Sequence, residues 1–118
     1  MIHSRDTLQR LEEVLEQRRN TPSEQSYTSR LMAGGPQKIG EKVVEEAVEV
    51  VQAATSESDE RVVSEASDLL YHLLVLLAFR KVPFQAVEEE LARRFGISGL
   101  VEKASRKSAH LDSSGERT

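Results

Sequence analysis

Two pairs of acidic side chains are the residues of this sequence best suited to chemistry. Glu46 and Glu49 lie three positions apart, and after a short spacer Glu65 and Asp68 repeat this spacing. At 3.6 residues per turn, each pair lies on one face of a helix. Two antiparallel helices joined by a short break bring all four carboxylates to one place. The negative charges of such a cluster repel one another, and a bound divalent cation would neutralise this repulsion.

The types of the candidate ligands indicate which cation they prefer. The chain has no cysteine, and His72 is the one histidine near the acidic pairs, so the ligands are mainly hard oxygens. Oxygen ligands suit Mg²⁺, or Mn²⁺ as an alternative, rather than Zn²⁺. A single E-x-x-E pair usually marks a solvated helix face, so the prediction depends on both pairs occurring together. We expect His72 to have a structural or supporting role. The predicted metal ligands are Glu46, Glu49, Glu65 and Asp68.

Basic side chains precede the first acidic pair. Arg30, Lys38 and Lys42 lie upstream of Glu46, and cations beside a metal–carboxylate site suit a substrate rich in phosphate. We therefore expect these three residues to bind the phosphates of a substrate. The alternative is that Lys42 forms an ion pair with a neighbouring glutamate, for a modest gain in stability. The sequence has no P-loop motif, which excludes that mode of phosphate binding.

Helices are the elements that must position these side chains. Glycine, proline and polar breaks divide the chain into segments with helical periodicity, and no segment alternates as a strand would. Ser58 or Asp59 is the expected cap of the helix that carries the second acidic pair. We predict an all-α bundle of four to five helices in a single domain, residues 1–107, followed by a mobile tail, residues 108–118. The predicted helices are 6–19, 37–55, 61–80 and 84–95, and residues 26–33 are expected to form a short helix or a turn.

Composition limits the classes of partner. The 118 residues carry a formal net charge of −4, which argues against a nucleic-acid binder. The N-terminus has no apolar core of a signal peptide, and the apolar run Leu69–Phe79 is too short to span a bilayer. The absence of cysteine is typical of a reducing cytoplasm. We therefore expect a cytoplasmic protein that binds neither nucleic acid nor membrane.

The same apolar run predicts self-association. Every residue from Leu69 to Phe79 is apolar except His72, and a helix that is apolar all round must be buried all round. A chain of this size has trouble covering such a helix alone, so we predict a homodimer that shares a helical core. The alternative is the central helix of a compact monomeric bundle.

Four segments together resemble the MazG-like all-α NTP pyrophosphohydrolases, and more narrowly the phosphoribosyl-ATP pyrophosphohydrolases of histidine biosynthesis. The two acidic pairs carry the resemblance to the wider superfamily, and the first and last segments narrow it to the histidine-pathway family. The resemblance spans about residues 8–106. The segments are SYTSRL from Ser26, KIGEKVVEEAVEVVQAA from Lys38, EASDLLYHLLVLLA from Glu65 and RFGISGLVEKASR from Arg94.

The resemblance implies a reaction as well as a fold. It implies cleavage of phosphoribosyl-ATP to phosphoribosyl-AMP and pyrophosphate with Mg²⁺, by an all-α cytoplasmic dimer whose four matching carboxylates hold the metal. We expect water to attack between the α- and β-phosphates and Glu45 or Glu49 to accept its proton. One alternative is a housekeeping pyrophosphatase of ordinary or damaged nucleoside triphosphates, which uses the same metal site. Another is a non-catalytic helical dimerisation module with solvated acidic faces.

Overall fold

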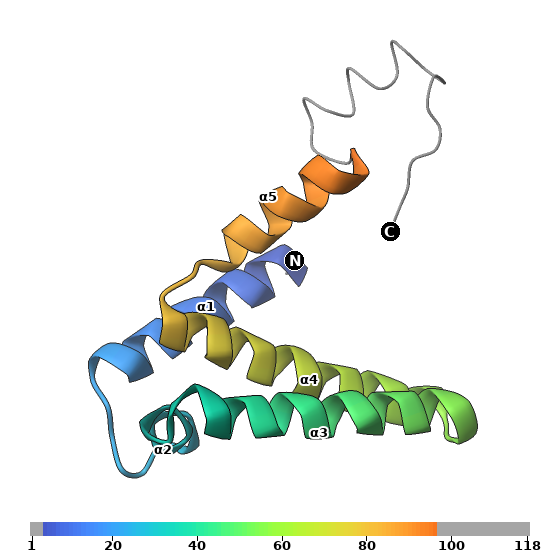
Figure 1. Cartoon of the computed structure of the whole chain (residues 1–118), viewed down its shortest axis with the longest axis horizontal. Helices are drawn as coiled ribbons and strands as arrows, with labels where there is room; N and C mark the ends of the chain where they lie inside the picture. Colours follow the sequence, from blue (N-terminus) through green and yellow to red (C-terminus); the bar gives the residue numbers. More distant parts are fainter. Residues whose placement is uncertain (1–3, 97–118) are drawn as a thin grey trace. The chain divides into compact units, whose positions relative to one another are not determined.

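The computed structural model describes residues 4–96, which are helical with short connections and contain no strand (Figure 1). The all-α prediction is therefore confirmed, and each predicted helix agrees with an observed one to within two residues at either end. Residues 97–107 of the predicted domain, and the predicted tail 108–118, lie outside the described residues. The helices are α1 (Ser4–Asn20), α2 (Tyr27–Ala33), α3 (Gly35–Ser56), α4 (Asp59–Arg80) and α5 (Phe84–Phe95).

Serine caps begin two of these helices. The Ser26 hydroxyl accepts a hydrogen bond from the backbone N–H of Ser29 at the start of α2. The Ser58 hydroxyl accepts one from the backbone N–H of Arg61 at the start of α4, as one of the two expected caps. Each cap satisfies an otherwise unpaired donor and contributes about 1 kcal/mol. The caps therefore fix where α2 and α4 begin.

A tight turn between α2 and α3 places the start of α3. Gly35 has a φ of +82°, in the left-handed region that glycine adopts without strain, and Pro36 follows in the first turn of the helix. Gly34 leaves room for a neighbour, because a Cβ atom there would lie 2.8 Å from Cβ of Lys38. Gly35 thus allows the chain to turn, and Gly34 allows the Lys38 side chain to pass close to the backbone.

Helices α3 and α4 form an antiparallel hairpin joined by Glu57 and Ser58 (Figure 1). The buried residues of α3 are Ile39, Glu46 and Ala53, so every seventh residue faces inward, as in helices packed at a shallow angle. The seam between the two helices therefore contains a carboxylate between two apolar positions. The buried residues of α4 are Glu65, His72, Leu74, Val75 and Ala78.

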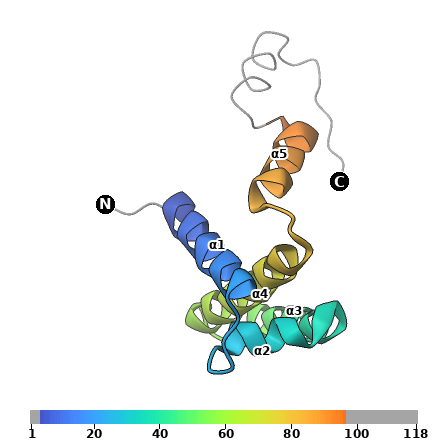
Figure 2. The ribbon, with the colours of Figure 1, turned by 90° about the vertical axis from the view of Figure 1, so that its left-hand side faces the viewer.

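Helices α1 and α2 pack against this hairpin (Figure 2). Leu15 of α1 is almost fully buried, and Leu31 and Met32 of α2 are buried as well. Arg19 of α1 donates from Nη1 to the carbonyl oxygen of Ala78, at 2.6 Å, which also accepts from the backbone N–H of Lys81 at the end of α4. The four helices thus form one compact unit that ends at residue 82.

Helix α5 belongs to a second unit, which begins at Pro83. It has no buried residue, and on its surface two arginines form ion pairs with the same glutamate. Glu90 accepts hydrogen bonds from Arg93 and Arg94, and these bonds, with Arg93 as the larger cause, lower the pKa of Glu90 to about 2. Gly96 then ends the helix in the left-handed conformation.

The apolar run Leu69–Phe79 lies within α4. Its helix is the one within the described residues that is long and apolar enough to cross a membrane by length and composition alone, a test that core helices of soluble proteins also pass. Within one chain the run is not buried all round, because Leu73 is 36% exposed although Leu74 and Val75 are buried. This partial exposure agrees with the prediction of a dimer but does not test it.

Candidate metal centre

Three carboxylates meet in the seam between α3 and α4. Glu46 and Glu49 from α3 and Glu65 from α4 each offer one oxygen, and the three oxygens lie within 4.8 Å of one another. We call these residues the three-carboxylate group. Glu46 and Glu65 are only 8% and 5% exposed, and Glu49 is half-buried. The hairpin therefore brings together side chains that are separated along the sequence, as the spacing predicts.

The three-carboxylate group has the electrostatics of a cation site. Oε1 of Glu46 and Oε1 of Glu65 are buried and have no hydrogen-bond partner among the described residues, which is costly for a carboxylate. The pKa of Glu49 is raised, first by its close approach to the Glu65 carboxylate and then by burial. Ligands that are all oxygens, that repel one another and that include two oxygens without partners fit Mg²⁺ or Mn²⁺.

The fourth predicted ligand, Asp68, is not part of the three-carboxylate group. Its side chain is exposed, and its backbone carbonyl oxygen lies 2.9 Å from Nδ1 of His72. Asp68 is three residues after Glu65, so it lies on the neighbouring turn of α4. Its role as a metal ligand stays a prediction.

The buried ring of His72 lies beside Glu46. Nδ1 of His72 is 3.9 Å from Oε2 of Glu46, and it donates a hydrogen bond to the carbonyl oxygen of Asp68, which can only accept. Nε2 forms a hydrogen bond with the Tyr27 hydroxyl, at 2.9 Å. His72 thus ties α2 to α4 next to the three-carboxylate group, which agrees with its expected supporting role.

The three predicted phosphate-binding residues lie on α2 and the first half of α3. Lys42 forms an ion pair with Glu45, with Nζ 3.2 Å from Oε1, as the alternative interpretation expected, and this contact raises the pKa of Lys42. Lys38 is exposed. Arg30 is exposed and donates from Nη1 to the carbonyl oxygen of Glu24, at 2.8 Å. Their part in binding phosphate stays a prediction, as does the catalytic part of Glu45.

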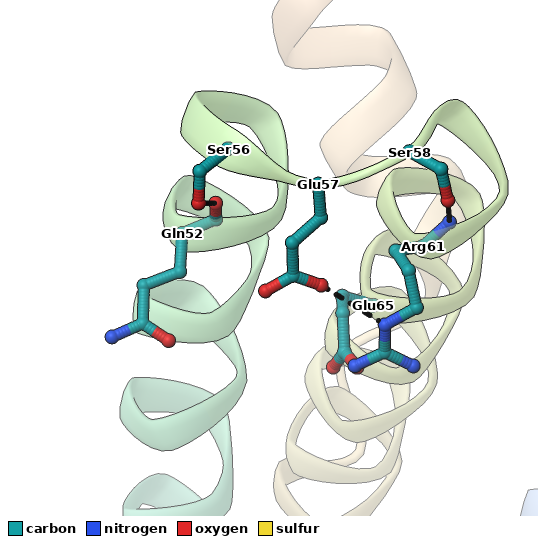
Figure 3. A network of polar contacts seen from close by, with 6 residues as sticks. All are labelled: Gln52, Ser56, Glu57, Ser58, Arg61 and Glu65. Carbon is teal, nitrogen blue, oxygen red and sulfur yellow. Dashed lines mark hydrogen bonds and ion pairs between the residues drawn. The ribbon is translucent and has the colours of Figure 1, made fainter.

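Arg61 contacts the three-carboxylate group but was not among the residues predicted from the sequence. Its Nη2 lies 2.5 Å from Oε2 of Glu65, and its Nε lies 3.1 Å from Oε1 of Glu57 (Figure 3). These contacts, with Glu57 as the larger cause, raise the pKa of Arg61. The signal in the sequence was its position four residues before Glu65, which is one helical turn.

Comparison with known proteins identifies the family. Residues 8–95 match the family described as phosphoribosyl-ATP pyrophosphohydrolase. A phosphoribosyl-ATP pyrophosphatase of Erythrobacter litoralis (strain HTCC2594) is 54% identical over 101 residues, which cover 86% of this chain and 97% of that protein. A protein of the same name from Paracoccus denitrificans (strain Pd 1222) is 50% identical over 100 residues, covering 85% and 93%. Another, from Trichlorobacter lovleyi (strain ATCC BAA-1151 / DSM 17278 / SZ), is 48% identical over 107 residues, covering 91% and 99%. The matched region contains the whole three-carboxylate group, and this chain belongs to the phosphoribosyl-ATP pyrophosphohydrolase family.

Proposed function

We propose that this protein hydrolyses phosphoribosyl-ATP to phosphoribosyl-AMP and pyrophosphate in the cytoplasm, as the second step of histidine biosynthesis. The observation that carries the proposal is the three-carboxylate group, in which Glu46 and Glu65 are buried, in a chain whose relatives are named for this reaction. A phosphoric anhydride carries several negative charges, and an acidic site binds it only when a cation lies between the two.

Glu46, Glu49 and Glu65 would hold Mg²⁺, and Asp68 is the proposed fourth ligand. Two facts support this assignment: the buried oxygens without partners, and a ligand set made only of oxygens. When bound, Mg²⁺ would supply charge neutralisation at the phosphate oxygens and a lowered pKa of a coordinated water. Mn²⁺ has similar ligand preferences and is the proposed substitute in binding experiments.

The other predicted residues act on the substrate and the attacking water. Glu45 or Glu49 would accept the proton of the water, and the two differ in position, because Glu49 belongs to the three-carboxylate group and Glu45 pairs with Lys42. Glu45→Gln is expected to lower kcat while leaving metal affinity intact, whereas Glu49→Gln lowers both. Arg30, Lys38 and Lys42 would hold the phosphates as fixed positive charges.

The direct experiment incubates the purified protein with phosphoribosyl-ATP, with Mg²⁺ or with a chelator, and identifies the products by chromatography. We expect phosphoribosyl-AMP and pyrophosphate in equal amounts, and only with Mg²⁺. Glu41→Gln is the matched control for Glu49→Gln, because Glu41 is an exposed glutamate on the same helix and outside the three-carboxylate group.

The same assay separates the alternatives. Faster release of pyrophosphate from dCTP, dUTP or ATP than from phosphoribosyl-ATP would contradict the proposed substrate and support a housekeeping pyrophosphatase. No turnover of any nucleotide, together with no binding of divalent cations, would support a non-catalytic helical module.

We further propose that a second copy of this chain covers an exposed stripe of valines on α3. Val44, Val48 and Val51 are each more than half exposed, and their spacing of four and three residues places them on one side of the helix. Contiguous exposed apolar side chains of this kind are typical of interfaces. A homodimer would remove them from water.

A further inference from the structure

The two carboxylate oxygens of Glu65 have different surroundings. Oε2 accepts a hydrogen bond from Nη2 of Arg61, whereas Oε1 is buried and has no partner among the described residues. The Glu65 residue is 5% exposed, so water does not compensate Oε1. One oxygen is therefore held by the protein, and the other is left for the cation proposed above.

Arg61 contacts a second carboxylate, that of Glu57, in addition to Glu65. Its Nε donates to Oε1 of Glu57, in the connection between α3 and α4 (Figure 3). Glu57, Arg61 and Glu65 are four residues apart in succession, so one guanidinium spans two turns and contacts a carboxylate at each end. The Ser58 cap fixes the backbone N–H of Arg61 at the same point.

We propose that Arg61 is a positioning residue, which fixes the orientation of the Glu65 carboxylate so that Oε1 is presented to the divalent cation. Glu57 has a related part, because it restricts the guanidinium to the conformation that reaches Glu65. The inference rests on the metal site of the proposed function. Partners of this kind commonly change metal affinity by about 10- to 100-fold.

The charge of Arg61 also affects metal affinity, in the direction opposite to its positioning effect. Its positive charge lies next to the three-carboxylate group and repels a bound cation, so removal of the charge alone would tighten metal binding. The Arg61 side chain is 54% exposed, and solvent therefore weakens this repulsion. Positioning and repulsion can be separated, because lysine keeps the charge but lacks the planar fork that contacts two carboxylates at once.

Three variants of the full chain distinguish positioning by Arg61 from repulsion by its charge. Arg61→Lys keeps the charge and loses the fork, Arg61→Met loses both, and Glu57→Gln weakens the restraint on Arg61 without changing Arg61. The matched control is Arg93→Lys, because Arg93 forms a comparable ion pair with Glu90, a residue outside the three-carboxylate group.

The readout is the dissociation constant of Mn²⁺, measured by electron paramagnetic resonance on protein without nucleotide, with circular dichroism as a check of folding. We expect Arg61→Lys to weaken Mn²⁺ binding by about tenfold, at the low end of the range for such partners because Arg61 is half exposed. Arg61→Met should weaken it less than Arg61→Lys does, since the lost repulsion offsets part of the effect. Glu57→Gln should weaken it by about threefold, and Arg93→Lys should have no effect.

Kinetics give a second readout that a merely structural role would not produce. At saturating Mg²⁺, the kcat of Arg61→Lys should return to the wild-type value, while the Mg²⁺ concentration for half-maximal rate rises. Wild-type affinity in Arg61→Lys, together with tighter binding in Arg61→Met, would overturn the proposal and leave Arg61 as a charge only. Failure of the wild-type protein to bind Mn²⁺ would overturn the metal site and this inference together.

Discussion

Replacement of Glu46 by glutamine should have opposite effects on stability with and without metal. Glu46 is 8% exposed, and its Oε1 has no partner. Glutamine has the same shape, and its amide can donate to the remaining carboxylates, so the metal-free protein should become more stable. The variant should also lose most of the stabilisation that a divalent cation gives, because one of the three oxygen ligands has lost its charge.

The distance between the carboxylate oxygens determines how much stability the metal-free Glu46→Gln variant should gain. Two unit charges at the 4.8 Å limit of the group repel by ~0.9 kcal/mol in water and by ~3.5 kcal/mol at an effective dielectric constant of about 20. Glutamine also loses the attraction between the charged Glu46 carboxylate and Nδ1–H of His72, 3.9 Å away, which offsets part of this gain and leaves about 1–3 kcal/mol. For a domain of this size, 1 kcal/mol corresponds to roughly 4 °C in Tm, so Glu46→Gln should raise the Tm of the metal-free protein by roughly 4–12 °C.

Thermal denaturation followed by circular dichroism measures both effects. A cation at 100 times its Kd stabilises the native state by about 2.7 kcal/mol, or roughly 10 °C for the wild-type protein. We therefore expect the variant to melt above the wild-type protein in chelator and to gain little from saturating Mn²⁺. A variant that melts lower in chelator and gains as much from Mn²⁺ as the wild-type protein would refute the reasoning.

Four further predictions follow from the site and the fold. Glu49→Gln should abolish turnover of phosphoribosyl-ATP with an unchanged helical spectrum, and retained turnover would exclude Glu49 from the site. Val48→Lys should convert a dimer to a monomer in sedimentation, because Val48 is 53% exposed on α3; an unchanged mass would place any interface elsewhere. Ser58→Ala should lower the free energy of unfolding by about 1 kcal/mol in urea titrations, through loss of the cap, and no change would contradict its capping role. Because neighbouring Glu65 raises the pKa of Glu49 above its ordinary value of 4.5, the native state binds this proton more tightly than the unfolded state does. The metal-free protein should therefore lose stability as the pH rises above 4.5, which is the opposite of a salt-bridged carboxylate; a flat Tm profile would contradict this.

Much of the fold was predictable because its signals are local. Periodicity, Gly34–Gly35, the polar break before α4 and Pro83 mark the helices, and their observed ends agree with these signals. Burial was less predictable, since it depends on which face meets a neighbour. On α3 the structure buries Glu46 and leaves Val51 exposed, because the side of the helix that carries Glu46 faces α4.

The candidate site was also predictable in part. The spacing of the acidic residues predicts that Glu46, Glu49 and Glu65 converge, because a hairpin requires it, and the structure brings them together. The position of the Asp68 side chain could not be predicted, since three-residue spacing fixes a helix face but not a rotamer. Arg61 was missed because an arginine one turn from a glutamate is common on exposed helices, and only burial of Glu65 gives the pair its significance.

The most direct test of the metal site is a crystal structure of the protein soaked in MnCl₂, with data collected at a wavelength where manganese scatters anomalously. We expect an anomalous peak in the seam between α3 and α4, about 2.0–2.3 Å from one carboxylate oxygen each of Glu46, Glu49 and Glu65. The same map would show whether Asp68 joins them. A seam without a peak at millimolar Mn²⁺, with the three side chains turned apart, would contradict the account.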